Sequence, residues 1–199
     1  MAARVFMIRH GETEWSLAGR HTSRTDLPLT EKGERDARAV GEALRGIDFG
    51  LVLTSPALRA RRTCELAALP RAAEIDPALV EWQYGDYEGR RTAEIARERP
   101  DWDLFRDGCP GGESPAQMSD RIDGVIARLR KADGNVAVFA HGHFAHVLGA
   151  RWIGLPILNA RHFSVAAASV GILGLARGDS GAPAILLWNA RPGRPLAER

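Results

Sequence analysis

Short apolar runs alternate with helical patterns along most of the chain, and this alternation restricts the possible folds more than any other feature. Residues 5–8, 51–53 and 136–140 form three such runs, each suited to one strand. The last run is apolar throughout, which is typical of a strand that helices cover on both faces. Strands that alternate with helices pair in parallel, because each helix carries the chain back across the sheet. The sequence therefore predicts an α/β fold, a three-layer α/β/α sandwich with a mostly parallel central sheet.

Signals for helix starts lie between these runs. Thr30 is a suitable N-cap for a helix with an apolar stripe. Ser55 and Pro56 follow the second run and combine a capping hydroxyl with a proline at the first helical position. Ser114 and Gln117 have the spacing of a capping box, in which each side chain binds the other residue's backbone N–H. Each signal predicts one helix.

The rest of the chain predicts an antiparallel pair and a cap. Two apolar runs, 170–175 and 184–188, flank a loop of Gly, Asp, Ser and Pro, which indicates a hairpin or edge strands. Residues 76–112 are less regular, and a long excursion of this kind in a compact domain is usually a functional lid. No repeat, linker or low-complexity block interrupts the chain. We therefore expect a single domain over residues 1–199, with a cap at about 76–112.

Composition excludes several classes of function. Lys and Arg number 27 against 25 Asp and Glu, so the net charge of +2 provides no basic field for nucleic acid. Cys64 and Cys109 form no CxxC pattern, which argues against a disulfide framework or a zinc site. The run at 5–8 is too short for a signal peptide, and no run is long enough to span a membrane. We expect a cytoplasmic protein without nucleic-acid or membrane partners, and the sequence predicts no particular oligomeric state.

Three predicted strands end in residues that suit an anion-binding site. In chain order these ends carry Arg9-His10-Gly11, Arg59 near the start of the next helix, and His141-Gly142-His143. The carboxyl ends of parallel strands open onto one crevice, so we expect these side chains to converge. Glycine after each histidine lets the backbone turn sharply and approach a ligand closely.

Two arginines and two histidines at one edge of a sheet favour phosphate chemistry. The planar guanidinium donates several hydrogen bonds and matches the oxygens of phosphate. A neutral imidazole at His10 can attack phosphorus, and the nearby positive charges of Arg9 and Arg59 disfavour its protonation. Arg9, Arg59 and His141 would then hold the oxygens of the transferred group.

A leaving alkoxide also needs a proton, which requires a carboxylic acid near the pocket mouth. Glu81 in "LVEWQYGDYEG" is our candidate, because Trp82 and Tyr84 next to it are apolar bulk that would favour the protonated form. Glu12 and Glu14 are the alternatives. We expect Glu12 to bind loop amides instead, since it follows His10 so closely in the chain.

These features together resemble the histidine phosphatase superfamily, which is related to cofactor-dependent phosphoglycerate mutase. The segments "RHGETEW", "LTEKG", "TSPALRARRT", "EWQYGDYEG" and "AHGH" occur in the family's order and at suitable spacing. "RHG" alone would not be specific, but the set is, and it covers nearly the whole chain. The resemblance implies a phosphoglycerate-mutase-like fold and no cofactor or metal.

The resemblance also implies roles for single residues. It implies that His10 is the phosphorylated nucleophile and Glu81 the proton donor, with Arg9, Arg59 and His141 in the phosphate pocket. Ser16, Thr22 and Ser23 fall where family members contact phosphate or substrate, Tyr84 falls at the pocket rim, and Gly142 and His143 lie beside the ligand.

Two features indicate a branch within the family. The segment between Glu81 and His141 is shorter than in true mutases, and His143 stands where mutases usually carry Asn. The segments "EWQYGDYEG", "RDGCPGGES" and "FAHGHFA" resemble the branch that holds broad acid phosphatases and sedoheptulose-1,7-bisphosphatases. We therefore expect a metal-independent phosphomonoesterase that uses a phosphohistidine intermediate on small phosphorylated metabolites, with sugar phosphates and bisphosphates as candidates.

Three alternatives stay open at this stage. The first is a phosphoglycerate-type mutase, and the second is a phospho-ligand binding module without catalysis. The third is a metal site on His141, His143 and His146, which the His-x-His spacing permits. No carboxylate follows at ligand spacing, however, and the arginines would repel a cation.

Overall fold

The computed structural model describes residues 4–176, 181–193 and 196. At its centre, the described residues form a six-stranded sheet in the order β3-β2-β4-β1-β5-β6. The strands are β1 (Val5–Arg9), β2 (Phe49–Thr54), β3 (Glu74–Ile75), β4 (Asn135–Ala140), β5 (Val170–Leu175) and β6 (Pro183–Ala190). The short edge strand β3 is the one that the sequence pattern did not indicate.

The sheet is parallel on one side and antiparallel on the other. β4 runs parallel to both β1 and β2, and β3 runs parallel to β2. β5 is antiparallel to β1, and β6 is antiparallel to β5. Arg9 is in register with Ala140, and Thr54 is in register with Phe139, so β1, β2 and β4 end at the same edge. This confirms the prediction of a mostly parallel sheet with a C-terminal antiparallel pair.

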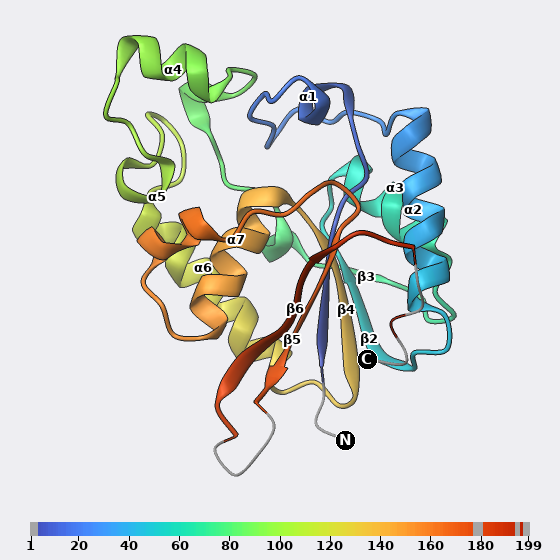
Figure 1. Ribbon diagram of the computed structural model, residues 1–199. Coiled ribbons are helices and arrows are strands. Elements are labelled where there is room, and N and C mark those ends of the chain that lie inside the picture. Colours follow the sequence, from blue (N-terminus) through green and yellow to red (C-terminus); the bar gives the residue numbers. More distant parts are fainter. Residues whose placement is uncertain (1–3, 177–180, 194–195, 197–199) are drawn as a thin grey trace.

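Helices cover both faces of the sheet, as Figure 1 shows. The α-helices are α1 (Glu14–Leu17), α2 (Glu31–Leu44), α3 (Leu58–Ala67), α4 (Thr92–Glu98), α5 (Leu104–Asp107), α6 (Pro115–Leu129) and α7 (Gly142–Trp152), and the 3-10 helices are η1 (Pro77–Leu79), η2 (Gly85–Tyr87) and η3 (Ile157–His162). The helices α2 and α3 lie on one face, and α6 and α7 lie on the other. Since successive side chains of a strand point to opposite faces, Val5 and Met7 pack in one core and Phe6 and Ile8 in the other. The three-layer sandwich is therefore confirmed.

Two of the predicted helix caps are present. The Thr30 hydroxyl accepts a hydrogen bond from the N–H of Gly33 at 3.0 Å, at the start of α2. Ser114 and Gln117 form the complete capping box at the start of α6. In both cases the sequence carries the signal because donor and acceptor lie three residues apart in the same turn.

The predicted cap of α3 is wrong. This helix begins at Leu58, two residues after Pro56, and its N-cap residue makes no side-chain cap. The Leu58 N–H donates instead to Oδ1 of Asp26 at 2.8 Å, from a loop far away in the sequence. The Ser55 hydroxyl lies 2.7 Å from Nε2 of His141. A contact in the folded site has taken the hydroxyl that the local pattern assigned to the helix.

Residues 76–112 contain η1, η2, α4 and α5, and α4 lies beyond the sheet near α1 in Figure 1. Backbone hydrogen bonds join this segment to the loop after α1, from His21 N–H to the Arg90 carbonyl and from Gly89 N–H to the His21 carbonyl. Its function as a cap and the single-domain organisation stay predictions. No helix within the described ranges is both long and apolar enough to cross a membrane.

Candidate active site

His10 and His141 lie side by side where β1 and β4 end. His10 is the residue after β1, and His141 is the N-cap of α7 directly after β4. Their ring centroids are 5.3 Å apart, and the two residues are 5% and 0% exposed. The convergence of these strand ends follows from the parallel pairing of β1 with β4.

The imidazole of His10 is held as a nucleophile. Its Nδ1 lies 2.7 Å from the carbonyl oxygen of Gly11. A carbonyl can only accept, so Nδ1 carries the hydrogen and Nε2 keeps its lone pair. Burial lowers the pKa of His10 well below its ordinary value, and the charges of Arg59 and Arg9 lower it further. The ring is therefore neutral, with a free nitrogen.

His141 is also neutral, and it is incompletely bonded. Burial lowers its pKa well below the ordinary value, with Arg59 and His10 acting in the same direction. Its Nε2 is bonded to the Ser55 hydroxyl, but its buried Nδ1 has no hydrogen-bond partner among the described residues. A buried polar atom without a partner is costly, so this nitrogen is available to a ligand.

Arg59 is a buried cation and Arg9 a half-buried one, and neither forms an ion pair with a carboxylate in the described chain. Arg9 donates to the carbonyl of Val165 at 2.7 Å, and Arg59 donates to backbone carbonyls of residues 22–25. These acceptors are neutral, and Nε of each guanidinium is buried without a partner. Burial lowers the pKa of both groups, because the charged form loses its hydration. An anion would supply the missing charge and hydrogen bonds.

Glu81 is bound by the first turn of α7. Its Oε1 accepts from the N–H of Phe144 at 2.7 Å and from its neighbour Trp82 at 3.0 Å. Its Oε2 accepts from the N–H of His143 at 3.0 Å. The N-terminus of a helix attracts negative charge, so the backbone positions this carboxylate without a side-chain partner.

Of the two aromatic residues that we expected to cover Glu81, Tyr84 lines the same cavity as Glu81, and Trp82 does not line it. The ring of Trp82 packs at right angles against Phe105, and its Nε1 donates to the carbonyl of Glu113 at 2.8 Å. Trp82 therefore belongs to the core below the site. Glu12, the alternative acid, accepts from the Thr30 hydroxyl at 2.9 Å rather than from a loop amide.

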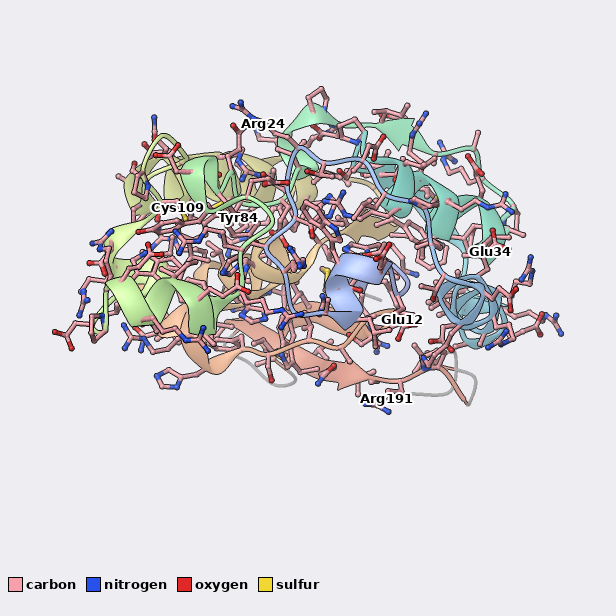
Figure 2. The ribbon with its side chains drawn as sticks, turned by 90° about the horizontal axis from the view of Figure 1, so that it is seen from above. Glu12, Arg24, Glu34, Tyr84, Cys109 and Arg191 are labelled. Atoms are coloured by element: carbon pink, nitrogen blue, oxygen red, sulfur yellow. The ribbon has the colours of Figure 1, made fainter. Side chains whose placement is uncertain are left out.

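A cavity of about 290 Å³ lies where the parallel strands end, and Arg9, His10 and Glu81 all line it. Figure 2 looks onto the molecule from above, with Tyr84 and Glu12 labelled. The predicted site residues that line the cavity are Arg9, His10, Ser16, Thr22, Glu81, Tyr84, Gly142 and His143.

Three predicted residues do not line this cavity. Arg59 and His141 are 1% and 0% exposed. The positive charge of Arg59 acts on His10, and Nε2 of His141 is bonded to the Ser55 hydroxyl. The Ser23 hydroxyl donates to Oε2 of Glu88 at 2.5 Å. Ser23 therefore anchors the loop whose backbone carbonyls hold Arg59.

Sequence reasoning did not assign several lining residues to the site. These are Gly19, Arg20, His21, Thr92, His146, Ser164 and Val165. His146 carried a usable signal, because it follows His143 by one helical turn and so faces the same way. His21 and Thr92 carried none, since their proximity depends on contacts between distant loops.

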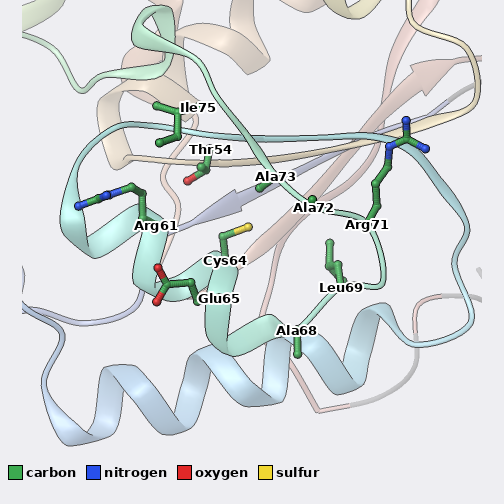
Figure 3. A pocket seen from close by; sticks show the side chains of 10 residues that line it. All are labelled: Thr54, Arg61, Cys64, Glu65, Ala68, Leu69, Arg71, Ala72, Ala73 and Ile75. Carbon is green, nitrogen blue, oxygen red and sulfur yellow. The ribbon is translucent and has the colours of Figure 1, made fainter.

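A second cavity, of about 370 Å³, lies between α3 and the edge strand β3 (Figure 3). Its charged and thiol groups are Arg61, Glu65, Arg71 and Cys64, and none of the predicted site residues lines it. Burial raises the pKa of the Cys64 thiol to about 12, so the thiolate needed for nucleophilic attack does not form at neutral pH. This cavity has no nucleophile and acid pair comparable to His10 and Glu81.

The geometry gives no support to the metal-site alternative. His141 lies against His10, whereas the rings of His143 and His146 meet edge to face with centroids 5.2 Å apart. Within the part of the chain that the structure describes, no group of three or more His, Cys, Asp or Glu side chains is arranged to hold a metal ion.

Known proteins share both the sequence and the fold. An acid phosphatase of Mycobacterium tuberculosis is 38% identical over 179 residues, 88% of each chain. A sedoheptulose 1,7-bisphosphatase of Saccharomyces cerevisiae is 37% identical over 190 residues, 79% of this chain and 70% of the yeast protein. The solved structure of an open reading frame of M. tuberculosis superimposes with a TM-score of 0.90 at 36% identity, covering 96% of this chain and 99% of the other. The model of the histidine phosphatase superfamily (branch 1) matches residues 5–191, and the chain is a member of this family.

Proposed function

We propose that this histidine phosphatase hydrolyses small phosphorylated metabolites in the cytoplasm, with His10 as nucleophile and Glu81 as proton donor. The observation that carries this assignment is the neutral His10 ring, with Nδ1 on the Gly11 carbonyl, near two guanidinium groups whose buried Nε atoms have no partner among the described residues. A nucleophile and groups that can bind an oxyanion adjoin each other there. The reaction needs no metal and no cofactor, and nucleic acid is not the substrate.

In the first step, Nε2 of His10 forms a bond to phosphorus while the bond from phosphorus to the leaving oxygen breaks. Glu81, protonated, gives its proton to that oxygen. Negative charge on the transferred group is stabilised by Arg9 and Arg59 and by Nδ1–H of His141.

In the second step, water releases the phosphate. The Glu81 carboxylate takes a proton from the water. The oxygen of the water bonds to phosphorus at the same time, and the bond from phosphorus to Nε2 of His10 breaks. The neutral imidazole, the protonated acid and inorganic phosphate are the products. The environment that keeps His10 neutral therefore favours its departure as well as its attack.

Sugar phosphates and bisphosphates are our candidate substrates. The names of two similar proteins, an acid phosphatase and a sedoheptulose 1,7-bisphosphatase, support this class. The test is to assay phosphate release from a panel of sugar phosphates, bisphosphates and nucleotides after exhaustive treatment with a chelator. We expect full activity in the chelator. Activity that returns only with an added divalent metal would contradict the mechanism, and isomer formation without phosphate release would indicate a mutase.

Arg59 is a second point at which the site can be tested. We expect Arg59→Lys to lower kcat/KM by roughly 10²-fold or more, because an ammonium cannot reproduce the planar fork of a guanidinium. Arg61→Lys is the matched control, since Arg61 lies on the same helix but lines the other cavity. Steady-state kinetics of Arg59→Lys within a few-fold of wild type would exclude Arg59 from phosphate binding.

A further inference from the structure

The cavity continues past the phosphate-binding groups into a wall of aromatic side chains. We call His21, Tyr84, His143 and His146 the leaving-group wall, and all four line the cavity. The hydroxyl of Tyr84 lies 2.6 Å from Nδ1 of His143. The centroid of His143 is 5.2 Å from that of His146 and 5.8 Å from that of His21. Three separate parts of the chain thus supply one continuous surface.

Every member of the leaving-group wall is uncharged at neutral pH. Burial lowers the pKa of His143 and of His146 to about 3. The neighbouring histidine and Arg9 act in the same direction at each residue, and Glu81 opposes the shift at His146. Burial also lowers the pKa of His21, although Glu81 and Glu88 oppose this. Burial raises the pKa of Tyr84 well above its ordinary value. The wall therefore presents three neutral imidazoles and a phenol.

Cationic partners for a second anionic group are scarce along this wall. Arg9 and Glu81 belong to the phosphoryl-transfer site. Among the described residues that line the cavity, Arg20 is the only other charged one. Arg20 is exposed at the rim, where it donates to the carbonyl of Gly89 at 3.0 Å and lies 6.0 Å above the ring of Trp15. A carboxylate seated against the wall would lose its hydration without gaining an ion pair.

The hydrogen-bonding capacity of the wall suits hydroxyl groups. A neutral imidazole offers one donor and one acceptor, as a hydroxyl does, whereas a carboxylate or phosphate only accepts. Nδ1 of His146 is buried with no partner among the described residues. The hydroxyls of Thr92 and Ser164 line the same cavity and add further mixed donors and acceptors.

We propose that the leaving-group wall selects substrates whose leaving group is a polyhydroxy compound and discriminates against leaving groups that bear a carboxylate. This proposal rests on the proposed function and narrows its substrate class. His143 and His146 are specificity-determining residues in it. Sites that hydrogen-bond a substrate hydroxyl reject analogues that leave their polar groups unpaired.

The test compares two substrates of equal chain length. Glycerol 3-phosphate and 3-phosphoglycerate differ at one end, where the first has a hydroxymethyl group and the second a carboxylate. We expect kcat/KM at pH 7 to be higher for glycerol 3-phosphate by about 10-fold or more, a cautious lower bound because sites that hydrogen-bond a substrate hydroxyl can reach roughly 10⁴-fold discrimination. Equal kcat/KM values, or a preference for 3-phosphoglycerate, would overturn the proposal.

Variants at one position then assign the preference to the wall. His146→Arg adds a cation, so the preference should shrink or reverse. His146→Gln keeps a neutral donor and acceptor, so the preference should persist. Leu175→Arg adds the same charge at a residue that is 43% exposed. Leu173 pairs with Val5, the first residue of β1, so Leu175 lies at the end of the sheet opposite to the cavity. Leu175→Arg should leave the preference unchanged, which controls for net charge.

Two further measurements keep the outcomes separate. If His146→Arg does not fold, as judged by its thermal transition, Thr92→Arg adds a cation at an exposed position of the same cavity and should shrink the preference too. If both cationic variants keep the wild-type ratio of kcat/KM values for the two substrates, the proposal is overturned. The proposed function fails differently: the wild type would then release no phosphate from either substrate and form no phosphoenzyme.

Discussion

Replacement of His10 by alanine is expected to abolish turnover and phosphoenzyme formation together. The His10 ring lies within reach of the positive charges of Arg9 and Arg59, and its Nδ1–H is fixed on the Gly11 carbonyl. Removing a covalent nucleophile removes the pathway rather than slowing one step, so a loss of several powers of ten is expected.

Labelled substrate followed by an alkaline quench measures this result directly. The wild type should retain acid-labile label, and His10→Ala should retain none. His162→Ala is the matched control, because His162 is an exposed histidine at the end of η3 that does not line the cavity. A far-UV circular dichroism spectrum that matches that of the wild type would establish that the alanine variant is folded. Turnover of that variant near the wild-type rate would eliminate His10 as the nucleophile.

Glu81→Gln is expected to slow the phosphorylation step by an amount that depends on the leaving group. A sugar alkoxide needs a proton to depart, whereas p-nitrophenolate departs almost unaided. Phosphorylation by a sugar phosphate should therefore slow by roughly 10²- to 10⁴-fold, and phosphorylation by p-nitrophenyl phosphate much less. Single-turnover measurements are needed, because Glu81 also activates water in the second step and would mask the difference in kcat.

The structure supplies the control for this experiment. Glu12→Gln changes an acid whose carboxylate is bonded to Thr30 and does not line the cavity, so it should show no dependence on the leaving group. Equal slowing of the first step for both substrates in Glu81→Gln would mean that Glu81 only positions the substrate. In that case Glu14 and Glu12 become the acids to test.

The central strands and their functional ends could be predicted because their information is local. The buried apolar runs of residues 5–8 and 136–140 are visible in consecutive residues of the sequence. His10 and His141 follow those strands directly, so parallel pairing alone brings them together. The same reasoning does not reach His21, which meets Tyr84 and His143 only through a loop packed on another loop.

Long-range hydrogen bonds account for the predictions that did not hold. Asp26 caps α3 across 32 positions, and Ser55 turns to His141 across 86. In each case the hydrogen-bond partner lies far away in the sequence, so a pattern of neighbouring residues does not reveal it. The position of Glu81 follows the same rule, because its donors come from the first turn of α7, more than 60 residues downstream.

The neutral histidines of this site impose a thermodynamic cost in acid. Between pH 6.5 and about pH 3, unfolded His143 and His146 bind protons that the folded chain excludes, so the free energy of unfolding falls as pH falls. In this range each proton excluded by the folded chain lowers the free energy of unfolding by at most about 1.4 kcal/mol per pH unit. A typical stability is only about 5–15 kcal/mol, so the loss is measurable. Denaturant titrations at pH 7 and pH 5 would reveal it, and an unchanged midpoint would contradict it. The chemistry that keeps these rings available to substrate thus sets an acid limit on the folded enzyme.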